Sequence, residues 1–181
     1  MKSRTILRLL VFSLVVTACS LAICRATPSR DELYLEVTIV TGEHSRDSNS
    51  VTRTLTISSG ELRYEETYAG ARSNRHQPVK KQYKLTKQDQ AALIALLKTK
   101  NLLVTSNISK PPTQKGFSRY FELSIRSRFD GKESTVAIDG SPSATELKTE
   151  SLYQGSVDLI EQLYKIINRT DPDIAVPALI E

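Results

Sequence analysis

Cysteine is scarce in this chain of 181 residues: there are two, Cys19 and Cys24, and both lie among the first 26 positions. We expect residues 1–26 to be removed, and a mature chain that begins at Thr27 would then contain no cysteine. Disulfides, thiolate nucleophiles and cysteine metal ligands are excluded for that mature chain. Its stability must come from a hydrophobic core, which about 155 residues can form because a chain of that size buries close to 70% of its unfolded surface.

Acidic residues are absent before Asp31, whereas basic residues precede an apolar run from Leu9 to Cys24. A positive start followed by such a run is typical of a signal peptide or a lipoprotein leader. The run of roughly 16 residues is shorter than the ~20 that span a bilayer as a helix, so a permanent transmembrane anchor is the less favoured interpretation. The sequence therefore predicts an exported protein, either periplasmic and envelope-associated or secreted.

Two cleavage sites fit this leader. Cys24-Arg25-Ala26 ends in a small residue before Thr27, as signal peptidase sites do. Val16-Thr17-Ala18-Cys19 instead resembles the lipobox of bacterial lipoproteins, and the resemblance implies that Cys19 carries the lipid and becomes the first residue. The apolar residues after Cys19 count against a lipobox, although the resemblance counts for it. Both cleavage sites therefore remain open. In either case the chain would contact a membrane only through its leader or through a lipid on Cys19.

The surplus of positive charge belongs mostly to the leader. The whole chain has 25 Lys and Arg residues and 20 Asp and Glu residues, a net charge of +5. Four of the basic residues and none of the acidic ones lie in residues 1–26, so the mature chain would keep 21 against 20, a net charge of +1. A domain with balanced charge gives no reason to expect nucleic acid as a partner.

Apolar residues alternate along six stretches of the mature chain and follow a helical period in two others. The expected order is ββββ-α-ββ-α, an α+β fold in which an antiparallel sheet of about six strands carries two helices on one face. Residues 27–170 would form this single domain, and residues 171–181 an irregular C-terminal tail. The predicted strands span residues 33–40, 51–57, 61–68, 79–85, 120–129 and 133–138, and the predicted helices span about 87–100 and 152–168.

Several turns and helix ends have recognisable residues. Asp130-Gly131 between alternating stretches favours a type I′ hairpin turn, and Ser59-Gly60 is a second turn between strands. Thr86 is suited to cap the first helix, with Asp89 in its first turn. Residues 106–116, which include two prolines, are predicted to be a loop.

Motifs for catalysis, for cofactors and for metals are absent: G-x-S-x-G, H-E-x-x-H, a P-loop and G-x-G-x-x-G do not occur. The two histidines, His44 and His76, lie in polar loops without a predicted partner. Glu65 and Glu66 are adjacent on a predicted strand and should point to opposite faces, which makes them a poor acid–base pair. We therefore predict no catalytic residue, no cofactor and no metal site.

The most uneven surface chemistry is predicted around residues 68–83, where basic residues gather near two tyrosines. Arg side chains and tyrosine rings together can bind an acidic polymer or an acidic surface of another protein. The alternative is a solvated loop whose cations balance Glu61, Glu65 and Glu66 on the neighbouring strand. The predicted binding surface consists of Tyr68, Arg72, Arg75, His76, Lys80, Lys81 and Tyr83.

An exported domain without catalytic motifs is best interpreted as a non-enzymatic binding or interaction module, and as a bacterial envelope lipoprotein if Cys19 is acylated. One alternative is a hydrolase that acts on an envelope or extracellular polymer through two converging carboxylates. A second alternative is a secreted protease inhibitor that presents the loop around Pro111-Pro112. Asn107 and Asn168 begin glycosylation acceptor sequences, which matter only in a eukaryotic host.

Overall fold

The computed structural model describes residues 32–44, 49–70, 73–110, 118–141, 144–177 and 179, all within the unit Glu32–Glu181. These residues form a seven-stranded sheet and the helices α2 (Lys87–Thr99) and α3 (Ser151–Ile167). Two short 3-10 turns, η1 (Ser73–Arg75) and η2 (Thr145–Thr149), complete the described elements. The strands are β1 (Tyr34–His44), β2 (Ser50–Ser58), β3 (Glu61–Ala69), β4 (Val79–Lys84), β5 (Ser106–Lys110), β6 (Ser118–Phe129) and β7 (Lys132–Gly140).

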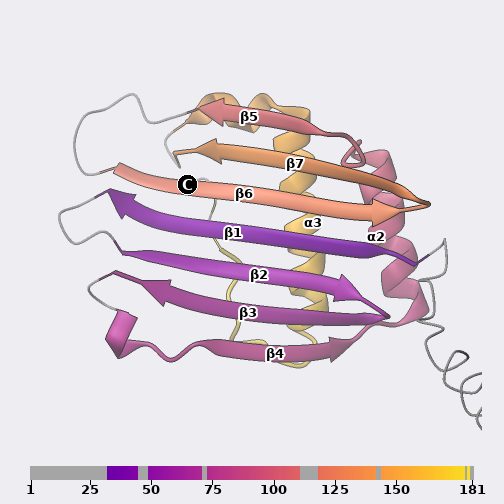
Figure 1. The fold of residues 1–181 in the computed structure, drawn as a ribbon, viewed down its shortest axis with the longest axis horizontal. Helices are drawn as coiled ribbons and strands as arrows, with labels where there is room; N and C mark the ends of the chain where they lie inside the picture. Colours follow the sequence, from indigo (N-terminus) through magenta and orange to yellow (C-terminus); the bar gives the residue numbers. More distant parts are fainter. Residues whose placement is uncertain are drawn as a thin grey trace, which may run out of the picture. The chain divides into compact units, whose positions relative to one another are not determined.

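The strands lie in the order β4-β3-β2-β1-β6-β7-β5 (Figure 1). Neighbouring strands are antiparallel, except that β5 runs parallel to β7. Strand β1 is central because β2 pairs with one of its edges and β6 pairs with the other. The pairing of β1 with β6 extends from Tyr34 opposite Arg128 to His44 opposite Ser118. The first four strands therefore join the last three through a single strand pair, β1–β6.

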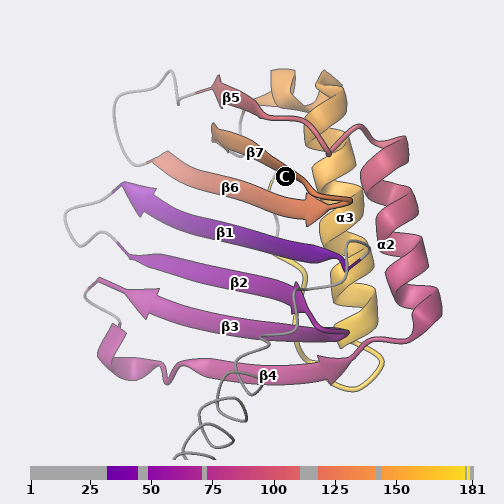
Figure 2. The same cartoon turned by 45° about the vertical axis from the view of Figure 1, so that its right-hand side comes forward.

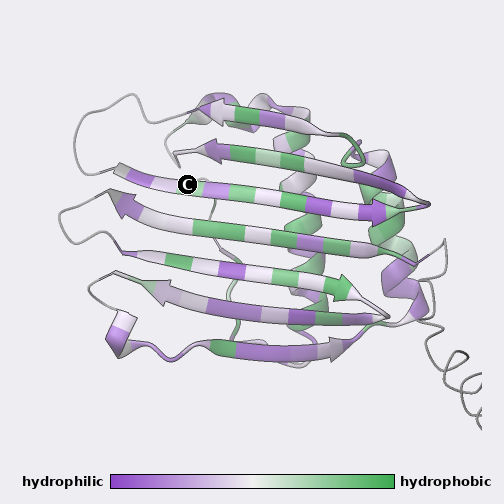
Figure 3. Cartoon of the chain, viewed as in Figure 1, coloured by the Kyte–Doolittle hydropathy of each residue, from purple (hydrophilic) through white to green (hydrophobic). Residues whose placement is uncertain are grey.

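Alternation along the strands decides which face of the sheet is buried. Leu35, Val37 and Ile39 of β1 have no measurable exposure, and the residues between them point to the opposite face. Both helices lie against the first face, and no described element covers the second (Figure 2). We call these faces the helix side and the open face. Hydrophobic and hydrophilic residues accordingly alternate along the strands in Figure 3.

The two helices complete the hydrophobic core together with the inward residues of the strands. Helix α3 buries Leu159, Ile160, Leu163 and Ile167, and α2 contributes two buried leucines. The helices approach each other closely at Gly155, where an added Cβ would lie 2.8 Å from the Cβ and 3.3 Å from the carbonyl oxygen of Lys100. A side chain at position 155 would therefore separate the helices.

The predicted turns and the predicted cap of α2 are confirmed. Asp130 and Gly131 have φ angles of 52° and 71°, and Ser59 and Gly60 have φ angles of 51° and 76°, as a type I′ turn requires. Thr86 accepts a hydrogen bond from the Asp89 amide while the Asp89 side chain accepts from the Thr86 amide, which is a capping box. Asn101, with φ of 55°, ends the helix in the left-handed conformation of a Schellman motif.

The fold class and the order of the predicted elements are confirmed, with one strand more than the expected six. The additional strand is β5, which lies within the segment 106–116 that we predicted to be a loop. Its five residues contain one apolar side chain, Ile108, so local alternation is too weak to identify it. Parallel pairing with β7, later in the chain, places β5 at the edge of the sheet.

The chain beyond α3 has neither helix nor strand over residues 171–177. It is nevertheless part of the packed structure. Ile174 packs against the core, and Leu179 belongs to the core with 5% exposure. Figures 1 and 2 show this yellow segment running back beside α3 on the helix side of the sheet.

Candidate functional site

The structure divides the predicted basic surface between the two faces of the sheet. Lys80 lies on the open face with its Nζ 3.2 Å from Oε1 of Glu65, and Lys81 lies on the helix side with its Nζ 3.3 Å from Oδ1 of Asp171. Tyr83 is 7% exposed, and its hydroxyl donates to Oδ2 of Asp171 at 2.7 Å. Tyr83 therefore belongs to the core, and the Lys80–Glu65 pair agrees with the alternative in which cations of this segment balance the neighbouring strand.

Two members of the predicted surface do come together. The rings of Tyr68 and His76 are stacked, with centroids 4.5 Å apart and planes 20° from parallel. Tyr68 lies on the helix side of β3, and His76 follows η1 at an exposed position. Arg75 is described only by its backbone in η1, and Arg72 lies outside the described residues. Among the described members, Lys80 lies on the opposite face of the sheet from Tyr68, Lys81 and Tyr83.

A polar cluster that the sequence analysis missed lies on the helix side of β2 and β3. Arg53 and Glu66 are opposite each other in the register of these strands, and Nε of Arg53 is 2.7 Å from Oε2 of Glu66. The hydroxyls of Tyr64 and Tyr68 also donate to the Glu66 carboxylate. The sequence contained the signal, because the Ser59-Gly60 turn sets a register that places both charges in inward rows of otherwise apolar or aromatic residues.

The cluster keeps Glu66 charged. Burial by itself would raise the pKa of Glu66, but the hydrogen bonds from Tyr68 and Tyr64 and the charge of Arg53 outweigh burial and lower that pKa below its ordinary value of 4.5. Tyr164 of α3 lies edge-on to Tyr64, with ring centroids 6.1 Å apart, and burial raises the pKa of Tyr164 to about 12. Both of these pKa shifts, of Glu66 downward and of Tyr164 upward, lead away from neutral pH. We interpret the cluster as a structural contact that connects β2 and β3 to α3 through the rings of Tyr64 and Tyr164.

Charged side chains on the open face are mostly arranged in ion pairs. The carboxylates in these pairs belong to β1, β3 and β7, and the pairs are Glu36–Arg126, Glu61–Arg63, Glu65–Lys80 and Glu133–Arg128. Glu122 of β6 and Asp139 of β7 are different because they face each other across the two strands. Neither carboxylate has an ion-pair partner among the residues that the structure describes.

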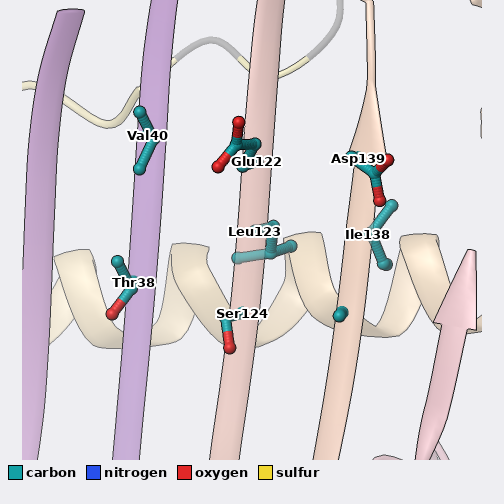
Figure 4. Close-up of a pocket in the computed structure, with 8 residues that line it drawn as sticks. Thr38, Val40, Glu122, Leu123, Ser124, Ile138 and Asp139 are labelled. Atoms are coloured by element: carbon teal, nitrogen blue, oxygen red, sulfur yellow. The ribbon is translucent and has the colours of Figure 1, made fainter. Parts of the chain in front are cut away.

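Glu122 and Asp139 line a shallow depression of about 270 Å³ in the open face (Figure 4). The depression crosses β1, β6 and β7, and side chains of Val40, Glu122 and Asp139 form one row across these strands in Figure 4. Oδ2 of Asp139 also accepts a hydrogen bond from Oγ of Ser109 at 2.6 Å. The complete lining is Thr38, Val40, Glu122, Leu123, Ser124, Ala137, Ile138 and Asp139.

The chemistry of the depression favours a cationic group. Like charges directly opposite each other on neighbouring strands destabilise a sheet, and a cation between Glu122 and Asp139 would relieve that repulsion. The hydroxyls of Thr38 and Ser124 can exchange hydrogen bonds with a bound group, and Val40 offers an apolar contact. The Asp130-Gly131 turn sets the register that brings the two carboxylates together, so this pair could also have been derived from the sequence.

The remaining candidate residues are only partly described. His44 is described by its backbone alone, and the leader with Cys19 and Cys24 lies outside the described residues, as does the loop around Pro111-Pro112. Within the described ranges, no group of three or more His, Cys, Asp or Glu residues could hold a metal ion. No helix in this part of the chain is both long and apolar enough to cross a bilayer.

Comparison with known proteins identifies no family for this chain. No protein-family model matches it. A search of curated proteins also finds no match. The fold defines its class as a two-layer α+β sandwich, in which one mostly antiparallel sheet carries two helices on one face and no described element on the other.

Proposed function

We propose that this domain is an exported, non-enzymatic binding module that holds a protein partner on the open face of its sheet. The depression across β1, β6 and β7 carries the proposal, because Glu122 and Asp139 have no cationic partner among the described residues while the neighbouring carboxylates are paired. The helix side offers less surface, since α2, α3 and the C-terminal segment lie against it.

The partner presents a Lys or Arg side chain to this depression. A guanidinium or ammonium group would lie between Glu122 and Asp139, where charge-assisted hydrogen bonds are stronger than neutral ones. The aliphatic part of the same side chain would contact Val40. An acidic polymer, the partner expected from residues 68–83, is less well supported because Lys80 and Lys81 are already paired with Glu65 and Asp171.

The test is a titration of the domain with tetralysine at low ionic strength, followed by backbone amide chemical shifts. We expect the largest changes in amide chemical shift in the residues around the depression. The Glu122→Gln/Asp139→Asn double variant should bind tetralysine about tenfold more weakly, because it removes two ionic contacts of about 0.2–1 kcal/mol each. The Glu61→Gln/Glu65→Gln double variant has the same net charge and should bind like the unmodified domain. Shifts centred on β3 and β4, or equal losses in both double variants, would contradict the proposal.

A second candidate is the hydrolase with paired carboxylates, and the direct opposition of Glu122 and Asp139 favours it. Glycosidases place two carboxyl groups about 5–10 Å apart around the bond that they cleave. The depression is open rather than enclosed, so it does not surround the substrate as such sites commonly do, and for this reason we prefer binding. Release of reducing ends from purified peptidoglycan, abolished by both Glu122→Gln and Asp139→Asn, would favour the hydrolase instead.

A further inference from the structure

The C-terminal segment beyond α3 is attached to the helix side at its two ends. Asp171 accepts hydrogen bonds from the Tyr83 hydroxyl at 2.7 Å and from Nζ of Lys81 at 3.3 Å, and both donors lie on β4. At the other end, Leu179 has 5% exposure and packs in the hydrophobic core. The segment between these ends runs back across the strands beside α3 (Figure 1).

The backbone in the middle of the segment makes only local hydrogen bonds. The amide of Ile174 donates to the carbonyl oxygen of Asp171 at 3.2 Å, and the side-chain amide of Asn168 donates to the carbonyl oxygens of both residues. In the described residues 171–177, no backbone hydrogen bond joins the segment to a strand. Val176 is 44% exposed. The segment is therefore held by one polar anchor at Asp171, by the buried side chain of Leu179 and by the partly buried side chain of Ile174.

Helix α3 does not need the segment in order to end correctly. The Asn168 amide donates to the carbonyl oxygen of Tyr164, and the Thr170 amide donates to that of Ile167, so the last turn is closed before Asp171. The hydrophobic core also contains the inward residues of the sheet and both helices, and Leu179 is its single member beyond α3 among the described residues. Parts of a protein with few buried contacts and no ladder hydrogen bonds open at lower free energy than the core does.

We propose that residues 171–177, together with Leu179, form a strap that opens as a unit while the sheet and both helices stay folded. In the closed state Leu179 fills its place in the core and Asp171 binds Tyr83 and Lys81. In the open state the strap remains tethered to α3 and uncovers the apolar seat of Leu179 on the helix side. This device is separate from binding on the open face, so either proposal can fail without the other.

Thiol labelling of a buried cysteine measures such opening directly. Both native cysteines are first replaced in the full chain, by Cys19→Ser and Cys24→Ser. The probe chain then carries Leu179→Cys as its sole thiol. The reference chain instead carries Val136→Cys on β7, where the native side chain has 0% exposure. We expect the strap thiol to react with an aromatic disulfide reagent about 100-fold faster than the reference thiol, because the reference requires opening of the core. Ile174→Cys, with Leu179 retained, is a second probe in case the first variant loosens the strap by itself.

The polar anchor gives the experiment its matched control. Asp171→Asn weakens the bonds to Tyr83 and Lys81 and should speed labelling of the strap thiol about fivefold to tenfold, without changing the reference rate. Asp173→Asn makes the same chemical change at an exposed neighbour and should leave both rates unchanged. Equal rates at positions 179 and 136 would mean that Leu179 is exposed only by global unfolding, which would overturn the proposal. A strap thiol that reacts as fast as a free cysteine would overturn it too, because the strap would then never be closed.

Discussion

Glu65 and Glu66 are adjacent in the chain and have the same chemistry, yet the sheet gives them opposite surroundings. Glu65 lies on the open face beside Lys80, where both side chains are largely in water. Glu66 points to the helix side and is 12% exposed, with Arg53, Tyr64 and Tyr68 around its carboxylate. A charge that is removed from water depends on its partners far more than an exposed one does.

We therefore predict different effects for the same substitution at these two positions. Glu66→Gln should lower the free energy of unfolding by about 2–3 kcal/mol, somewhat less than breaking a fully buried pair, because it leaves Arg53 without a counter-charge. Glu65→Gln should change that free energy by less than about 0.5 kcal/mol. Urea unfolding at pH 7, followed by circular dichroism, measures both values, and similar losses for the two variants would contradict the burial of the Glu66 pair.

The effect of Glu66→Gln should also depend on pH. The pKa of Glu66 is lower in the folded chain than its ordinary value of 4.5, so its charge stabilises the fold fully above that pH. The stabilisation is lost as the pH falls below 4.5 and through the folded pKa. The difference in unfolding free energy between the unmodified chain and Glu66→Gln should therefore shrink in acid. A difference that stays constant from pH 7 to pH 3 would show that the lost charge is not the cause.

At the residue scale, the predicted binding surface was grouped by distance along the chain, which is not distance in space. The predicted surface grouped Lys80, Lys81 and Tyr83 because they are close in sequence, but alternation on β4 sends them to different faces. The pairs Arg53–Glu66 and Glu122–Asp139 are separated in the chain and meet only through hairpin register. Both registers follow from turns that were predicted, so these pairs were within reach of the sequence, whereas the depression between three strands was not.

At the scale of elements, the contact between α2 and α3 is the most sensitive to a small change. Gly155→Ala would normally favour a helix by about 1 kcal/mol. Here the added Cβ would meet the Cβ and the carbonyl oxygen of Lys100, which cannot move without shifting the end of α2. We expect a net loss of about 1–2 kcal/mol in unfolding free energy, since overpacking outweighs helix propensity. Glu161→Ala, at an exposed position of the same helix, is the control and should be nearly neutral; a stabilised Gly155→Ala chain would mean that the helices can separate freely.

Elements with local signals were predictable, and β5 was not. The capping box at Thr86 and the turn at Asp130-Gly131 depend on residues within a few positions of each other, and the structure contains both. Strand β5 has little alternation of its own and gains its pairing from β7, which follows it in the chain. A pairing between distant segments leaves almost no trace in a five-residue pattern, so this strand was predicted to be part of a loop.

At the scale of the whole molecule, the proposal of export makes a prediction about mass. The mature protein from its native host should lack the leader, beginning either at an acylated Cys19 in the membrane fraction or near Thr27 in the soluble fraction. Intact mass spectrometry of the two fractions distinguishes these outcomes. The first would place the binding face beside a membrane, and the second would make it freely diffusing. A full-length mass, from a chain that begins at Met1, would contradict export. The proposed binding function would then no longer be that of an exported protein.

The position of β1 in the middle of the sheet has a consequence for the order in which this protein can fold. Strand β1 pairs early with β2, its neighbour in sequence, but its other edge waits for β6, and Tyr34 of β1 pairs with Arg128 of β6. Until β6 has been synthesised, the incomplete chain exposes an apolar strand, β1, whose free edge can pair with another chain. We expect folding to be slow and all-or-none, governed by this one distant pairing. A chain released before β6 should therefore aggregate rather than persist as a folded half.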